Sequence, residues 1–272
     1  MQRRVKPLRN IIFWSSASGK SGTSNNMLAV STMTAVLYSL KTLLVQFDKK
    51  SSPLSMAFEG GKNINALNEE FSFYNRKGLD EIWDKSKIKK IEKDIISDNT
   101  VNVRHTNLFY MPSSKKQEEL FDERFVKMLL EGMKDFESIN FIDCANGKSK
   151  LTETLFCNTD IIVVNIFQGM EYLDEIMEDW RIREKAIFIV GRYDGNSKDN
   201  LTKIRHKYNI SKDSIGVIPY NIHFHDAIKD GKLVPFITRG IFSKKTDADY
   251  DFIMELYHTT NMILRKAGYE GI

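Results

Sequence analysis

Three consecutive residues, Gly19-Lys20-Ser21, form the pattern in this chain that is best suited to binding phosphate. They lie in a loop of small residues, 15–23, between an apolar run and an amphipathic stretch. In a strand–loop–helix unit, backbone N–H groups and the helix N-terminus face phosphate oxygens, the lysine neutralises phosphate charge and the hydroxyl reaches Mg²⁺. The sequence therefore predicts a nucleotide-binding loop around Lys20.

The loop departs from the full Walker A pattern at one position. That pattern requires a glycine five residues before Gly19, and Trp14 stands there instead. A plain serine-rich turn is the alternative interpretation, because three letters of a motif arise often by chance. The predicted strand before the loop and the predicted helix after it favour the nucleotide-binding interpretation.

A second candidate site residue is Asp143, which ends the apolar run Ile139–Asp143. A carboxylate at the end of a buried strand can hold Mg²⁺ directly or through a water ligand. Strands commonly end in Asp, so this residue means little alone. Together with Lys20 upstream, it indicates a Walker B acid.

Apolar runs alternate with amphipathic stretches along the chain, which predicts a doubly wound α/β fold with a mostly parallel sheet and helices on both faces. We expect a basic arm over residues 1–10 and one P-loop domain over residues 11–272, since no repeat or linker divides the chain. The predicted strands cover 11–14, 42–47, 101–111 (one strand or two), 139–143, 161–167, 186–191 and 217–219, and the main predicted helices cover 27–40, 116–133, 172–183 and 249–267.

The composition, with 42% hydrophobic and 28% charged residues, is that of an ordinary globular protein. No apolar stretch approaches the roughly 20 residues of a membrane span, so we expect a cytoplasmic protein without membrane insertion. The two cysteines, Cys144 and Cys157, lack CxxC spacing and are expected to be reduced. His223 and His225 would face one side of a strand, but no third metal ligand accompanies them.

The order of these motifs resembles the ParA/MinD-like ATPases. In that family the helix after the loop carries a Ser/Thr cluster and an Asn, the next strand ends in Asp-x-Asp, and later strands end in proline-containing motifs. The matching residues here are Ser21, Thr23, Ser24 and Asn26, then Gln46-Phe47-Asp48, Leu108–Pro112 and Ile218-Pro219-Tyr220-Asn221. The resemblance extends from Ile11 to about Lys266.

The resemblance implies ATP and Mg²⁺ as cofactors and assigns a role to each matching residue. Lys20 and Asp48 would be catalytic, the first at the phosphates and the second orienting the attacking water. Ser21 and Asp143 would hold Mg²⁺. The remaining nucleotide-binding positions implied by the resemblance are Ser18, Gly19, Gly22, Thr23, Asn26 and, beside the adenine, Pro219.

Two departures from the family pattern bear on catalysis. Ser15 stands where the family has its signature lysine, and Gln46 replaces the first Asp of Asp-x-Asp. A missing cation at the transferred phosphate costs as much as ~10³-fold in related phosphoryl-transfer enzymes. We therefore expect ATP binding with very slow turnover.

The resemblance implies an ATP-dependent homodimer that positions cargo such as a plasmid, a chromosome or a mobile element. A TadZ-like positioning scaffold with little or no hydrolysis is the alternative. A bacterial tyrosine kinase is disfavoured because the C-terminal tyrosines are scattered, and the absence of a CxxC opposes a metal-cluster carrier.

A net charge of +4 permits a nucleic-acid partner without requiring one. Basic residues outnumber acids from Lys198 to Lys266, and phosphate contacts from them would bind DNA without reading its sequence. An ordinary solvated surface and an adaptor or cargo protein remain alternatives. The basic residues are Lys203, Arg205, Lys207, Lys212, Lys229, Lys232, Arg239, Lys244, Lys245, Arg265 and Lys266.

Overall fold

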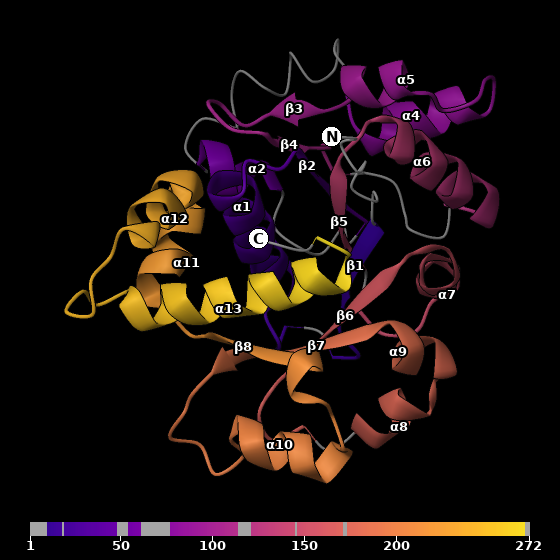
Figure 1. Ribbon diagram of the computed structural model, residues 1–272. Helices are drawn as coiled ribbons and strands as arrows, with labels where there is room; N and C mark the ends of the chain where they lie inside the picture. The colour runs from indigo at the N-terminus through magenta and orange to yellow at the C-terminus, as the bar shows by residue number, and fades with distance from the viewer. Residues whose placement is uncertain are drawn as a thin grey trace, which may run out of the picture.

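A single eight-stranded sheet organises the computed structural model (Figure 1), in the order β3-β4-β2-β5-β1-β6-β7-β8. All neighbouring strands are parallel except β3, which pairs antiparallel with β4 at one edge. The predicted mostly parallel sheet is confirmed. The strands are β1 Asn10–Trp14, β2 Thr42–Gln46, β3 Val101–Asn102, β4 Leu108–Tyr110, β5 Ile139–Asp143, β6 Ile161–Ile166, β7 Ala186–Tyr193 and β8 Ile215–Pro219. The structure describes residues 10–17, 19–47, 54–60, 77–113, 121–144, 146–170 and 173–269.

The central strands are buried on both faces, which explains their nearly continuous apolar sequences. In β1, Ile11 and Phe13 pack into the core on one face, while Ile12 and Trp14 pack into the core on the other. Helices cover both faces, as predicted. One face is covered by α1 Thr23–Leu37, α2 Leu54–Glu59, α11 Ile222–Lys229, α12 Leu233–Ile241 and α13 Tyr250–Lys266, and the other by α4 Leu79–Ser86, α5 Lys93–Asp98, α6 Glu123–Asp135, α7 Lys150–Asn158, α8 Leu173–Glu178, α9 Trp180–Lys185 and α10 Leu201–Tyr208.

Three local predictions are wrong. The helix predicted over 116–133 begins at Glu123, because the Asp122 side chain accepts a hydrogen bond from the Phe125 N–H and caps the helix there; residues 116–120 lie outside the described residues. The predicted helix 172–183 is two short helices, since Asp179 caps a new helix in its middle. His223 and His225 lie in helix α11 rather than in a strand.

The carboxyl ends of the parallel strands lie along one edge of the sheet, where ligands of open α/β sheets bind. Strand β1, with β5 on one side and β6 on the other, places the predicted phosphate-binding loop at the middle of this edge. Among the helices of the described residues, none combines the length and apolar character needed to cross a membrane.

Candidate nucleotide-binding site

The loop after β1 has the backbone shape expected of a phosphate-binding turn. Gly19 and Gly22 both adopt left-handed conformations, with φ of 75° and 69°, which favour glycine. Gly22 is the N-cap of α1 and has no side chain to accept hydrogen bonds from the first N–H groups of the helix. These donors, at the N-terminus of a 15-residue helix, suit an anion.

Asn26 holds the loop to the sheet from inside. Its Nδ2 donates to the Ser21 carbonyl oxygen at 3.1 Å and to Asn165 Oδ1 at 2.8 Å. Asn165 in turn donates from Nδ2 to the Trp14 carbonyl oxygen at 3.3 Å. Both asparagines are buried, so these hydrogen bonds replace those that the side chains would make with water in the unfolded chain. The predicted site residue Asn26 therefore shapes the loop through its backbone.

Gly191, at the end of β7, lets the loop approach the sheet closely. A Cβ atom at this position would lie 1.9 Å from the Ser21 carbonyl oxygen and 2.7 Å from Asn26 Nδ2. Gly191 and Asn165 are not among the site residues that the sequence pattern predicts. The only signals in the sequence were a polar residue and a glycine within otherwise apolar runs.

Trp14, which replaces the Walker A glycine, ties the loop to the segment after β5. Its Nε1 donates to the Gly147 carbonyl oxygen at 2.7 Å, and the Gly147 N–H donates to the Ser15 carbonyl oxygen at 2.9 Å. Ser15, at the position of the family's signature lysine, is fully buried, and its Oγ accepts from the Ala17 N–H at 3.3 Å. This part of the loop is thus built into the core.

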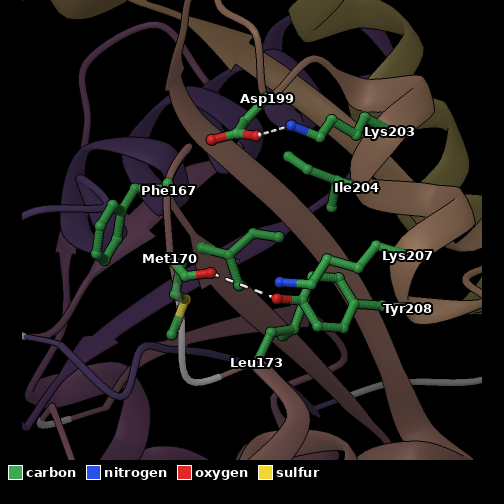
Figure 2. Close-up of a pocket in the computed structure, with 10 residues that line it drawn as sticks. Phe167, Met170, Leu173, Asp199, Lys203, Ile204, Lys207 and Tyr208 are labelled. Carbon is green, nitrogen blue, oxygen red and sulfur yellow. Dashed lines mark hydrogen bonds and ion pairs between the residues drawn. The ribbon is translucent and has the colours of Figure 1, made fainter.

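Lys20 is exposed at the edge of the sheet and forms no ion pair within the described chain. Its Nζ lies 5.4 Å from the centroid of the Phe167 ring. Figure 2 shows Phe167 at the side of a pocket of about 180 Å³, opposite Ile204 and Tyr208 of α10. Phe167 links this pocket to Lys20 of the loop. Ligand pockets usually measure roughly 300–1,000 Å³, so the pocket is too small for a nucleotide.

Of the two predicted Mg²⁺ ligands, Asp143 ends β5, the neighbour of β1, and Ser21 lies just before α1 in the loop that follows β1. Ser21 Oγ lies 3.1 Å from Thr23 Oγ1 in a buried pair. Asp143 is also buried, and its Oδ2 accepts from Gln46 Nε2 at 3.2 Å. Hydroxyl and carboxylate oxygens are the ligand types that Mg²⁺ prefers, so this donor set fits the ion.

Gln46 connects Asp143 to the segment after β4. Its Oε1 accepts from Ser113 Oγ at 2.5 Å, while its amide donates to the carboxylate of Asp143. The residue at the family's first Asp position is therefore a buried hydrogen-bonding bridge. Ser18 and Asp48, two other predicted site residues, lie outside the described residues.

Pro219 lies at the same edge, at the end of β8. The following helix α11 begins after Asn221, whose side chain accepts from the Phe224 N–H at 2.7 Å. His225 of this helix approaches the start of α1, with its Nδ1 3.5 Å from Asn25 Nδ2. Burial is the main cause that lowers the pKa of His225, and the nearby charges of Arg192 and Lys229 lower it further.

No protein-family model matches the chain, and no curated protein matches it by sequence. Solved structures do match its fold over almost the whole chain. A ParA family ATPase from Chlorobium tepidum matches with a TM-score of 0.68 at 14% identity, covering 94% of this chain and 99% of that chain. The chain has the ParA/MinD fold.

Two further structures with this fold contain nucleotides. A plasmid partition protein of Borrelia burgdorferi bound to AMPPNP matches with a TM-score of 0.63 at 15% identity, covering 96% of this chain and 100% of that chain. The septum site-determining protein MinD of Pyrococcus horikoshii, in complex with Mg-ADP, gives 0.62 at 16% identity, covering 95% and 97%. The ParA/MinD fold of the present chain agrees with the resemblance seen in its sequence.

Proposed function

We propose that this protein binds Mg·ATP at the loop after β1 and acts as a slow ATPase switch of the ParA/MinD type that positions cargo. The observation that carries the proposal is that contacts with the sheet hold the loop after β1 in place. Asn26 and Gly191 hold the Ser21 backbone against the sheet, so that Lys20 and the N-terminus of α1 lie together at its edge. The nucleotides bound to the Borrelia and Pyrococcus proteins support the same ligand class here.

Slow hydrolysis follows from the two residues at which the chain departs from the family pattern, Ser15 and Gln46. Ser15 is buried and uncharged, so it cannot supply the cation that the family's lysine supplies. The Gln46 amide already occupies one oxygen of Asp143, so Gln46 adds a hydrogen-bond donor where the family has a second carboxylate. Fewer groups are left to stabilise the transferred phosphate, and turnover is slow.

The choice of partner is also part of the proposal. The basic residues named above belong to α10 and the short 3₁₀ helix Lys212–Ser214, to α11, α12 and the segments beside them, and to the end of α13; α10 lies apart from α12 in Figure 1. In an ATP-dependent dimer the basic residues of two protomers would contact DNA phosphates together, which would make DNA binding depend on the nucleotide. An adaptor or cargo protein is the other partner that the switch could use.

Calorimetric titration of Mg·ATP into the wild type, Lys20→Ala and Lys127→Ala tests the nucleotide site. Lys127 is an exposed lysine of α6, paired with Glu123, and serves as the matched control. We expect binding to the wild type and to Lys127→Ala and none to Lys20→Ala. Equal affinity of all three proteins would overturn the site, and steady-state turnover of tens per second would overturn slow hydrolysis.

Sedimentation velocity with and without a slowly hydrolysed ATP analogue tests the dimer, and duplex-DNA binding at two salt concentrations tests the partner. DNA binding that needs the analogue and weakens steeply with salt would support the DNA-binding form of the switch. No binding at low salt in either nucleotide state would favour an adaptor or cargo protein.

A further inference from the structure

Arg192 is a cation that the proposed phosphate-binding residues do not include. It directly follows Gly191 in β7 and is exposed at the edge of the sheet. It forms no ion pair or hydrogen bond with any residue in the described parts of the chain. A Cβ atom on Gly22 would lie 3.9 Å from Arg192 Nε and 4.0 Å from its Cγ, so the arginine side chain runs beside the first residue of the loop-to-helix junction.

The backbone of Arg192 is strained in a way that aims the side chain. Its φ is 51°, in the left-handed region that non-glycine residues rarely adopt. The register of β7 against β8 shifts between Gly191 and Tyr193, so Arg192 occupies the extra position of a bulge. Bulges of this kind redirect side chains near functional sites, and strained residues gather there.

The position of this charge is unfavourable in the absence of an anion. The N-terminus of α1 carries the positive end of the helix dipole, and its first turn contains no acidic residue. Lys20 adds a second cation at the same edge. Neither cation has an ion pair within the described part of the chain, so the two charges and the helix N-terminus repel one another, and a bound anion between them removes that repulsion.

We propose that Arg192 binds the phosphate nearest the ribose in the nucleotide that Lys20 and the loop hold. This rests on the proposed nucleotide site. In a P-loop the lysine reaches the terminal phosphates, while the residues after the Ser/Thr face the phosphate closer to the ribose. Gly22 follows Ser21, so Arg192, which lies beside Gly22, contacts the triphosphate at its ribose end. Arg192 supplies, from within the protomer, positive charge at a site where Ser15 supplies none.

The test compares the affinities of ATP and ADP for four proteins by titration in the presence of Mg²⁺. Arg192→Gln should weaken both nucleotides by the same factor, roughly tenfold, because both contain the phosphate that the arginine contacts. Arg104→Gln, which changes an exposed arginine in the β3–β4 turn, should bind both as the wild type does. Unchanged affinity of Arg192→Gln, or a loss for ATP alone, would overturn the inference.

The fourth protein, Arg192→Gly, separates binding from folding. Glycine adopts a φ of 51° without strain, so this variant should melt no lower than the wild type while binding ATP as weakly as Arg192→Gln. A lower melting temperature with wild-type affinity would show that Arg192 has only a structural role. If the wild type itself bound no nucleotide, the proposed function would fail, whereas nucleotide binding by the wild type together with unchanged affinity in both Arg192 variants would overturn this inference alone.

Discussion

The two ends of the sheet both contain buried polar side chains, but they use them differently. At the amino end, Asn140 donates to Asn10 Oδ1 at 2.7 Å and accepts from Ser138 Oγ at 2.6 Å. At the carboxyl end, the Asn26–Asn165 pair instead fixes the backbone of a loop. The amino-end asparagines hydrogen-bond to each other and to Ser138, whereas the carboxyl-end pair supports a loop on which Lys20 is exposed.

The same contrast holds for the lysines at the two ends. Lys41, near the amino end, donates to the Phe136 carbonyl oxygen at 2.6 Å and lies 3.5 Å from the centroid of the Phe136 ring. Lys20, at the carboxyl end, lies 5.4 Å from the Phe167 ring centroid, but neither it nor Arg192 donates a hydrogen bond to any described residue. A polar cluster that satisfies itself is structural, while one that leaves cations unpaired beside a helix N-terminus indicates a binding site.

The largest effect is expected at Gly191, on which the carboxyl end depends most. In Gly191→Ala the new Cβ would overlap the Ser21 carbonyl oxygen, so we expect a loss of about 2–3 kcal/mol of stability and no measurable ATP binding. Denaturant unfolding and ATP titration check both. The matched control is Gly195→Ala, whose Cβ would have no neighbour closer than 3.9 Å. Wild-type ATP binding by Gly191→Ala would show that the loop does not depend on this contact.

The two asparagine networks can be compared directly. Asn165→Leu and Asn140→Leu each leave buried partners unsatisfied, so each should lower stability by about 1–3 kcal/mol. Only Asn165→Leu should also weaken ATP binding, because only Asn165 is bonded to the residue that holds the loop. Equal ATP affinities for two equally destabilised variants would remove the distinction between the ends of the sheet.

A smaller effect is expected at Gln46. Gln46→Asp places a second carboxylate against Asp143, so the variant should lose about 1 kcal/mol without Mg²⁺ and recover it when Mg·ATP is added. For a chain of this size that difference is roughly 2–4 °C in melting temperature. Gln46→Asn, which adds no charge, controls for the shortened side chain. If the melting temperature of Gln46→Asp did not rise when Mg·ATP was added, this would argue against a metal at Asp143.

The smallest effect is expected at the amino end, at Lys41. Burial is the main cause that lowers the pKa of Lys41 below its usual 10.5, with a further contribution from Lys93. Because the unfolded chain then binds more protons just below pH 10.5, the wild type should gain stability relative to Lys41→Met as the pH rises through that range. ATP affinity should be the same for both proteins. A pH-independent stability difference, or a change in ATP affinity, would contradict this assignment.

The sequence alone predicted the parts of the site that depend on local pattern. The strand, the loop with Lys20 and the helix that follows are contiguous, and Asp143 ends a recognisable apolar run. Asn165 and Arg192 could not be predicted, because their roles arise only when strands distant in sequence become neighbours. Asn26 and Asn165, for example, are 139 residues apart.

The helix boundaries that were missed have a different cause. Asp122 and Asp179 are good N-caps, but apolar periodicity continues across both positions and conceals the helix starts. Capping by a single side chain overrode the longer pattern. The Trp14 departure from the Walker A pattern was visible in the sequence, yet its hydrogen bond to Gly147 depends on the approach of β5.

Hydrogen exchange at individual backbone amides tests most directly whether the carboxyl end of the sheet is the nucleotide site. Saturating Mg·ATP should slow exchange at the amides of residues 19–23 at least about tenfold, because bound phosphate occupies their N–H groups. The β3–β4 turn, residues 103–107, should keep its rate, and Lys20→Ala should show no protection. Unchanged exchange at 19–23 in ATP-saturated wild type, or protection at 103–107 instead, would contradict the assignment of the site.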